Sequence, residues 1–277
     1  VARLELASDA DGNAVAAWRV GDSVIQSASF NPLGTWMRLQ DIHANRINDF
    51  PSSIDLSVGN GLAALAWSDT KHHTFYATLQ PFATAWSQPQ AVSSNSSFAA
   101  FPVIAVNKYN TIMIIWQGTK SLTAKLLPFG SKNWQSVDSP GLVSYGRGME
   151  LLAAPNGDFQ LMWIGSGVNF AKMAVDSKKW TDRHYFMYTN MLYRASLVLD
   201  DKGDALATWV DMNTVYASVR PFGKEWQPIQ NFGGPSFGYI DRPALASNGT
   251  AMIVWFGYEA QIDGYVAKGV TASELFN

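Results

Sequence analysis

The sequence predicts an all-β protein built as a six-bladed β-propeller, with four antiparallel strands in each blade. The first observation is the placing of tryptophan. All eleven tryptophans fall into two series, and neighbours within a series are 46 to 50 residues apart. The first series comprises Trp18, Trp67, Trp116, Trp163, Trp209 and Trp255, and the second comprises Trp36, Trp86, Trp134, Trp180 and Trp226. This regularity indicates six repeated units.

A second column of residues supports the repeat. Six residues before each first-series tryptophan stands a residue type that tolerates positive φ, as tight turns require. These residues are Gly12, Gly61, Asn110, Gly157, Gly203 and Gly249. Between turn and tryptophan run short β-prone segments such as residues 112–115, which are apolar on both faces, as in strands that are covered on both sides. No segment shows a sustained helical period.

Each unit therefore reads as strand A, a tight turn, strand B ending at the first tryptophan, a loop, strand C, a second turn, and strand D opening with the second tryptophan. The C-to-D turn is written Pro-Leu-Gly at 32–34 and Pro-Phe-Gly at 128–130 and 221–223. Proline ends strand C because it offers no ladder N–H, so we interpret this motif as structural. In the last unit the chain stops where strand D would begin, and we expect three strands there with a rudimentary fourth.

We expect a single domain over residues 1–277. The predicted blades cover approximately 1–46, 47–97, 98–146, 147–193, 194–240 and 241–277.

Composition excludes several classes of protein. The formal net charge of −2 gives no basic field for nucleic acid, and the absence of cysteine excludes disulfides and thiolate metal sites. The longest apolar run, 112–116, is far shorter than a membrane-spanning helix. Residues 1–20 do not read as a signal peptide and the chain begins with Val1, so we interpret it as a processed or excised piece.

No metal or cofactor site is expected. The stretch Asp9-Ala10-Asp11-Gly12-Asn13 resembles the start of a calcium loop, but the position of the closing glutamate is taken by Trp18, which favours a hairpin turn. The four histidines show no metal-binding spacing; they are His43, His72, His73 and His184.

The repeat phrases, such as residues 9–18 followed by Gly34-Thr35-Trp36, resemble those of bacterial extracytoplasmic six-bladed propellers, which are related in layout to the sialidase superfamily. This resemblance implies a secreted, periplasmic or cell-surface protein. Sialidase-type propellers carry an Asp-box, Ser-x-Asp-x-Gly-x-x-Trp, at the C-to-D turn. Residues 31–36 and 221–226 keep the glycine and tryptophan but lack the aspartate, which argues against sialidase activity.

The D-to-A loops are the candidate binding segments, since loops held by a rigid scaffold often carry function. Four of them each contain one arginine close to the next strand A, with aromatic residues nearby. The predicted ligand-binding residues are Arg46, Arg147, Tyr193, Arg194, Tyr239 and Arg242. Guanidinium groups bind carboxylates and phosphates, and aromatic faces suit sugar rings. The alternative is that each arginine pairs with a local acid such as Asp49, Glu150 or Asp241.

Three functions stay open. The preferred one is a non-catalytic, lectin-like module, monomeric, that binds a glycan, peptide or protein at the channel mouth. The second is a sialidase-like glycoside hydrolase, which needs a pair of carboxylates; candidates are Asp49, Asp69, Asp211, Asp241, Glu259 and Asp263, and nothing in their spacing selects a pair. The third is a structural propeller within a larger secreted protein.

Overall fold

The computed structural model describes residues 2–44, 47, 54–80, 83–94, 98–142, 148–188, 192–211, 214–233, 236–240, 242–259 and 264–272. The chain divides into two compact units. Unit 1 comprises residues 1–142 with 174–180, and unit 2 comprises residues 143–173 with 181–277.

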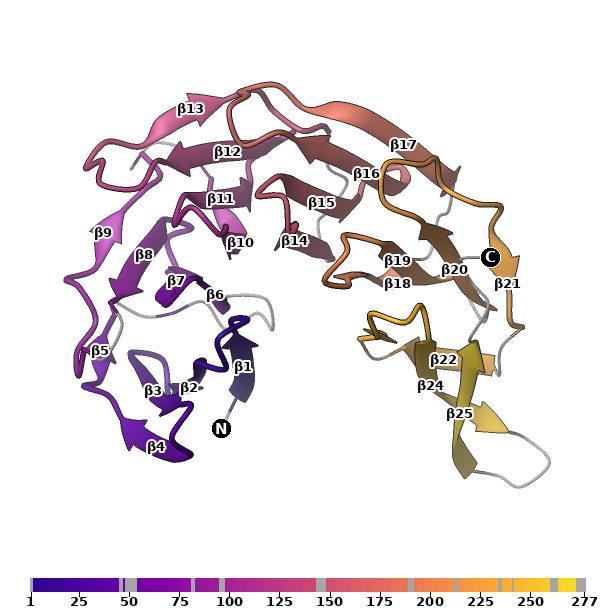
Figure 1. Cartoon of the computed structure of the whole chain (residues 1–277), viewed down its shortest axis with the longest axis horizontal. Coiled ribbons are helices and arrows are strands. Elements are labelled where there is room, and N and C mark those ends of the chain that lie inside the picture. Colours follow the sequence, from indigo (N-terminus) through magenta and orange to yellow (C-terminus); the bar gives the residue numbers. More distant parts are fainter. Residues whose placement is uncertain are drawn as a thin grey trace. The chain divides into compact units, whose positions relative to one another are not determined.

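Unit 1 contains three antiparallel sheets, labelled in Figure 1. The first sheet is β1 (Ala2–Ser8), β2 (Ala14–Val20), β3 (Val24–Asn31) and β4 (Thr35–Arg38), and β5 (Ile42–His43) also pairs with β3. The second sheet is β6 (Ile54–Gly59), β7 (Leu62–Ser68), β8 (Thr74–Leu79) and β9 (Gln90–Ala91). The third sheet is β10 (Ala100–Val106), β11 (Ile112–Gln117), β12 (Leu122–Leu127) and β13 (Gln135–Val137). Apart from β5, strands adjacent in sequence are paired in each of these sheets.

Unit 2 contains the next three sheets. The fourth is β14 (Met149–Ala153), β15 (Phe159–Ile164), β16 (Gly167–Met173) and β17 (Thr181–Tyr188). The fifth is β18 (Leu192–Leu199), β19 (Ala205–Asp211), β20 (Thr214–Arg220) and β21 (Gln230–Asn231). The sixth is β22 (Ser236–Ile240), β23 (Ala244–Leu245), β24 (Ala251–Glu259) and β25 (Gly264–Ala272). Because β22 and β23 pair in succession with one edge of β24, while β25 pairs with the other, this last sheet is three strands across, as expected.

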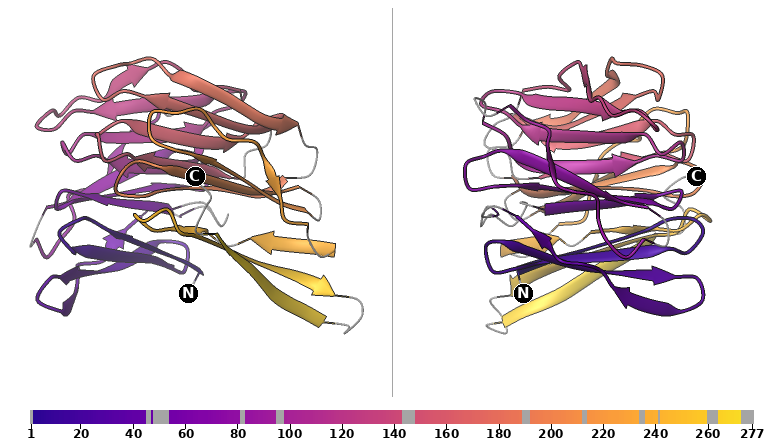
Figure 2. Two further views of the ribbon diagram at one scale, coloured as in Figure 1. Left: turned by 45° about the vertical axis from the view of Figure 1, so that its right-hand side comes forward. Right: turned by 90° about the vertical axis from the view of Figure 1, so that its left-hand side faces the viewer.

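The structure confirms the two repeated positions, the first-series tryptophan and the turn residue before it. Every first-series tryptophan lies on the strand that follows the A-to-B turn, namely β2, β7, β11, β15, β19 or β24. All six turn residues have positive φ: 83° at Gly12, 78° at Gly61, 56° at Asn110, 96° at Gly157, 90° at Gly203 and 81° at Gly249. The six-bladed β-propeller fold class is thereby confirmed. The strands of each sheet are twisted, as the two views in Figure 2 show.

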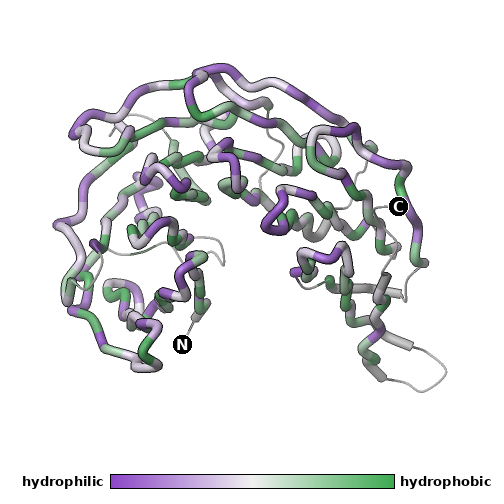
Figure 3. Tube along the Cα trace, viewed as in Figure 1, coloured by the Kyte–Doolittle hydropathy of each residue, from purple (hydrophilic) through white to green (hydrophobic). Residues whose placement is uncertain are grey.

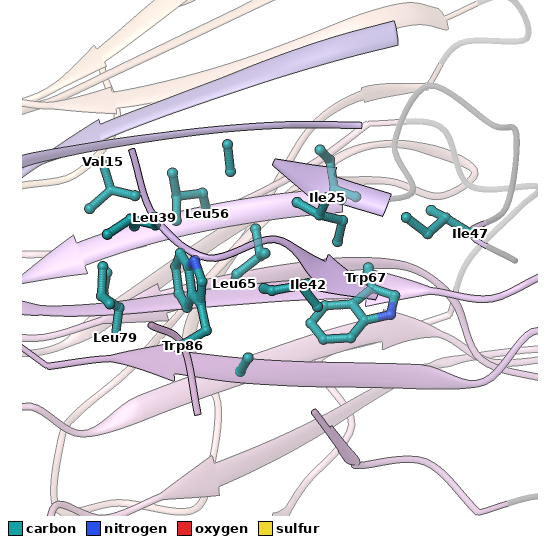
Figure 4. Close-up of a cluster of buried hydrophobic side chains, with 14 residues drawn as sticks. Val15, Ile25, Leu39, Ile42, Ile47, Leu56, Leu65, Trp67, Leu79 and Trp86 are labelled. Carbon is teal, nitrogen blue, oxygen red and sulfur yellow. The ribbon is translucent and has the colours of Figure 1, made fainter. Parts of the chain in front are cut away.

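Within each unit, the core lies between the faces of successive sheets. Strands β7, β11 and β15 are buried along their whole length, which explains why their sequences are apolar on both faces. Figure 4 shows the cluster between the first two sheets of unit 1, where Val15 and Ile25 pack with Leu65 and Trp67. Many of the hydrophilic residues lie in the turns that connect the strands (Figure 3).

The second-series tryptophans lie just before the outer strand of their own sheet in four of five cases, whereas the sequence placed them at the start of that strand. They contact the preceding sheet instead. Trp86 donates its indole N–H to Ser27 Oγ of the first sheet at 2.8 Å, and the ring of Trp134 meets Tyr76 of the second sheet edge-on at 4.9 Å. Trp36, inside β4 of the first sheet, is 50% exposed. The prediction that strand D opens with tryptophan is correct for this sheet alone.

Candidate ligand-binding sites

Each sheet presents two ends. Strands A and C both run toward one end, where the A-to-B and C-to-D turns lie, and we call it the turn end. The opposite end, which we call the loop end, carries the B-to-C and D-to-A loops. The sequence assigns all the predicted binding residues to loops of the loop end.

Of the predicted loop-end residues, Arg46 and Arg147 lie outside the described residues. Tyr193 and Arg194 belong to β18 and Tyr239 belongs to β22, but their side chains fall outside the described part of the structure. Arg242, which stands two residues before β23, is the predicted residue whose side chain is described.

Arg242 forms an ion pair with Glu150 of β14. The Glu150 side chain is only 10% exposed, whereas that of Arg242 is 49% exposed. Ser196 of β18 donates its hydroxyl to Glu150 Oε2 at 3.4 Å. Three successive sheets of unit 2 thus contribute to one polar cluster. Arg242 thus pairs with an acid that the alternative named, but Glu150 belongs to another sheet and is not its neighbour in sequence.

The position of Glu150 is fixed by the repeat. Glu150 lies opposite Met162 and Ser196 lies opposite Thr208, and in both sheets the opposing residue directly precedes the first-series tryptophan. The equivalent residue of the second sheet, Asp55, lies opposite Ala66.

Asp55 uses its carboxylate differently. Its Oδ2 accepts the backbone N–H of Ile104 on β10 at 2.7 Å, and Ser57 Oγ accepts that of Val106 at 3.0 Å. Because β10 lies at the edge of its sheet, these side chains satisfy edge amides that strand pairing leaves open. Asp55 is therefore structural. Glu150 instead contacts the side chains of Ser196 and Arg242, and that of Arg242 is half exposed.

The candidate catalytic carboxylates do not form a described pair. Asp69 is buried and accepts the backbone N–H groups of Lys71 at 2.9 Å and His73 at 2.8 Å, so it stabilises its own turn. Asp49, Asp241 and Asp263 lie outside the described residues, as does the Glu259 side chain, and Asp211 ends β19. Within the described ranges, no three His, Asp or Glu side chains are grouped so as to hold a metal.

The Asp9 turn is a hairpin turn, as predicted. The Asp9 carboxylate accepts the backbone N–H groups of Asp11 at 3.1 Å and Asn13 at 2.9 Å.

At the turn end of unit 2, a cleft opens between the fourth and fifth sheets. Its lining residues are Asn156, Asp158, Gln160, Lys172, Gly203, Ala205, Arg220, Pro221, Phe222 and Gly223. Lys172 Nζ lies 3.4 Å from Asp158 Oδ2, and Asn156 donates its side-chain N–H to the same oxygen at 2.7 Å. Gln160 is 4% exposed, and its buried Oε1 has no hydrogen-bond partner in the described part of the chain. The cleft thus combines an ion pair with an unsatisfied acceptor.

An aromatic cluster supports one wall of this cleft. The Arg220 guanidinium pairs with Asp182 and lies 5.4 Å from the centre of the Phe170 ring. The His184 ring meets the Phe186 ring edge-on, with 4.6 Å between their centres, and the Trp226 ring lies 6.2 Å away. Burial lowers the pKa of His184 below its ordinary value, and Glu225 and Asp182 partly oppose this shift.

A cleft at the same repeat position lies between the first and second sheets of unit 1. Asn13, Val15 and Ser29 line it where the unit 2 cleft has Asp158, Gln160 and Lys172, since Val15 lies opposite Ser29 just as Gln160 lies opposite Lys172. It encloses about 70 Å³, against about 10 Å³ in unit 2. The two clefts share a place in the repeat and differ in chemistry.

No family model matches the chain, and no curated protein matches it. Solved structures resemble it at low identity. A fucose-specific lectin from Aleuria aurantia is 12% identical with a TM-score of 0.57, covering 98% of this chain and 96% of the lectin. The BP39L lectin from Burkholderia pseudomallei is 11% identical with a TM-score of 0.64, covering 98% of this chain and 84% of that chain. At such identities the likeness shows a shared fold.

A third structure is a protein of unknown function from Dyadobacter fermentans, which is 11% identical with a TM-score of 0.53 and covers 97% of this chain and 93% of that one. In the described part of the present chain, no helix has the length and apolar character to cross a membrane.

Proposed function

We propose that this protein is a non-catalytic carbohydrate-binding module whose ligand binds at the loop end. The observation that carries this proposal is the polar cluster of Glu150, Ser196 and Arg242, in which a nearly buried carboxylate is held beside a half-exposed guanidinium. The proposed site also includes the other predicted residues, Arg46, Arg147, Tyr193, Arg194 and Tyr239.

The chemistry of the cluster suits a sugar. Carboxylate oxygens accept hydrogen bonds from hydroxyl groups, and a guanidinium donates several N–H groups in a fixed fork. The neighbouring hydroxyl groups of a sugar can donate to the carboxylate and accept from the guanidinium. Tyr193 and Tyr239 would add aromatic faces for the apolar side of a ring. Because Ser196 and Arg242 both hold Glu150, the carboxylate is oriented before any ligand arrives.

The solved structures that this chain resembles support the choice of ligand class, since two of them are lectins and one is named as fucose-specific. Fucose-containing glycans are therefore the first probes. A lectin role also agrees with the extracytoplasmic location inferred from the repeat phrases.

The experiment is a glycan array probed with the whole chain, with Arg242→Gln and with the matched control Arg38→Gln. Arg38 is an exposed arginine of unit 1 that pairs with Asp41 at 3.2 Å. We expect the unaltered chain and Arg38→Gln to bind the same glycans, and Arg242→Gln to lose at least ten-fold of the signal. An array without any bound glycan contradicts the proposal, as does an equal loss in both variants.

A second measurement separates binding from catalysis. Glycans that score on the array, and a fluorogenic sialoside, are incubated with the protein and their products are analysed. We expect no hydrolysis. Turnover that disappears on replacing a loop-end carboxylate would instead identify a sialidase-like glycoside hydrolase.

A further inference from the structure

Three of the described C-to-D turns carry an apolar residue of which at least half is exposed. Leu33 is 91% exposed, Phe129 is 67% exposed and Phe222 is 50% exposed. Proline and glycine build this turn, and the corner position between them is on the surface, where a polar residue is equally compatible with the backbone. Phe82 of the second sheet lies outside the described residues. The exposed part of these side chains is free for a role other than packing.

Phe222 is the exposed ring that lines a described polar cleft, the one between the fourth and fifth sheets. Its backbone N–H donates to Asp204 Oδ1 at 2.7 Å, which fixes the turn. The ring covers Gly203, where an added Cβ would stand 2.8 Å from the Phe222 ring. Backbone and ring are therefore both held in place, with half of the side chain left open to solvent beside the cleft.

Gln160 supplies the second feature. Buried acceptors are almost always hydrogen-bonded, and each exception needs an explanation. Gln160 lines the cleft, and its buried Oε1 atom has no hydrogen-bond partner among the described residues. The repeat does not require a polar residue at this position, because Val15 occupies it in the equivalent cleft of unit 1. Gln160 thus presents an acceptor that awaits a donor from outside the protein.

The charges of the cleft are balanced. Lys172 pairs with Asp158, and Arg220 pairs with Asp182. A ligand with a net charge would gain little from such a site. The space between the lining residues holds about 10 Å³, which is room for one water molecule. A ligand can therefore insert one small polar group and must lie mainly across the rim.

We propose that this cleft is a second binding site, specific for a neutral saccharide. The apolar C–H face of the sugar ring lies on Phe222, and one hydroxyl reaches into the cleft and donates to Gln160 Oε1. The Lys172–Asp158 pair provides a donor and an acceptor for the neighbouring hydroxyls. This site is at the opposite end of the strands from the Arg242 cluster, so the proposal goes beyond the proposed function and does not depend on it.

The test uses the whole chain carrying Arg242→Gln, so that loop-end binding is weakened. The probes are the methyl glycosides of fucose, galactose, mannose and N-acetylglucosamine, with methyl glucuronide as the charged comparison, and binding is measured by NMR titration. We expect at least one neutral glycoside to bind, and to bind more tightly than the glucuronide. Adding Phe222→Ala should weaken that binding at least ten-fold, while Phe222→Tyr retains it.

Two further variants keep the test decisive. Gln160→Met removes the unpartnered oxygen at nearly constant volume, so it should weaken sugar binding several-fold while Tm stays the same or rises, which a merely structural role would not produce. Tyr109→Ala removes an exposed aromatic residue of unit 1 and should leave binding unchanged. The proposal is overturned if no neutral glycoside binds to the Arg242→Gln chain, or if Phe222→Ala and Tyr109→Ala behave alike.

Discussion

The indole N–H of Trp86, which precedes the outer strand of the second sheet, donates to Ser27 Oγ on β3 of the first sheet at 2.8 Å. Ser27 is fully buried and Trp86 nearly so. The ring lies among Leu79, Leu39 and other apolar side chains of the same cluster (Figure 4). A tryptophan of one sheet therefore fastens that sheet to the preceding one, by both burial and a hydrogen bond.

This contact predicts two graded losses of stability. Trp86→Phe keeps most of the apolar contact but leaves Ser27 Oγ without its donor, so it should cost about 1–3 kcal/mol in the free energy of unfolding. Trp86→Ala also opens a cavity and should cost about 3–5 kcal/mol. Urea unfolding followed by tryptophan fluorescence gives both values.

Trp36→Ala is the matched control, because Trp36 belongs to the same series but is half exposed. It should cost less than half as much as Trp86→Ala. If the two alanine variants unfold at the same urea concentration, the Trp86 contact does not hold the first two sheets together.

The repeat could be predicted because its constraints are local. Gly203 must adopt positive φ whatever surrounds it, and Trp209 must lie where strand B is covered on both sides, so both residues mark their positions in the sequence. The direction in which Trp86 packs could not be predicted, because it depends on Ser27 in another sheet. Periodicity places residues on strands and does not tell which neighbouring sheet a turn residue meets.

The site was less predictable for the same reason. The sequence predicted Arg242 as a binding residue and indicated Glu150 as a possible acid partner of a loop arginine. Their pairing could not be predicted, because it joins two sheets that are not adjacent in sequence. Phe222 was assigned to a structural turn, since the Pro-Phe-Gly motif itself does not reveal how exposed the ring is. Gln160 is a polar residue at a position that is apolar in the other copies of the repeat, but the sequence does not tell whether its side chain has a hydrogen-bond partner.

Gly203 offers a test of how Phe222 is held. Its φ is 90°, and an added Cβ would stand 2.8 Å from the Phe222 ring. Gly203→Ala should therefore destabilise the fold by more than Gly12→Ala, which has a φ of 83° but no atom closer than 4.0 Å.

A double-mutant cycle completes this test, measured by thermal unfolding. In the Phe222→Ala background the extra cost of Gly203→Ala should shrink to that of Gly12→Ala, about 1 kcal/mol. An unchanged cost would mean that the ring does not lie over Gly203.

His184 predicts a specific pH dependence. Burial lowers its pKa in the folded state from the ordinary value of 6.5, so the unfolded chain takes up the proton first as the pH falls. The stability that neutral His184 contributes is present above pH 6.5 and is lost as the pH falls through the folded pKa. Tm should therefore decrease less between pH 7.5 and pH 5 in His184→Gln than in the unaltered chain.

His43→Gln is the comparison for this prediction, since His43 is exposed. It should show the full decrease of Tm between the same two pH values. Should His184→Gln retain the full decrease as well, acid sensitivity arises elsewhere in the protein.

The central claim is that the loop-end cluster of Glu150, Ser196 and Arg242 binds carbohydrate. The most direct measurement is calorimetric titration of a glycan from the array into the Phe222→Ala chain, with and without Arg242→Gln, so that the turn-end cleft does not contribute. We predict that Arg242→Gln raises Kd at least ten-fold, about 1.4 kcal/mol. The same Kd in both chains would contradict the claim.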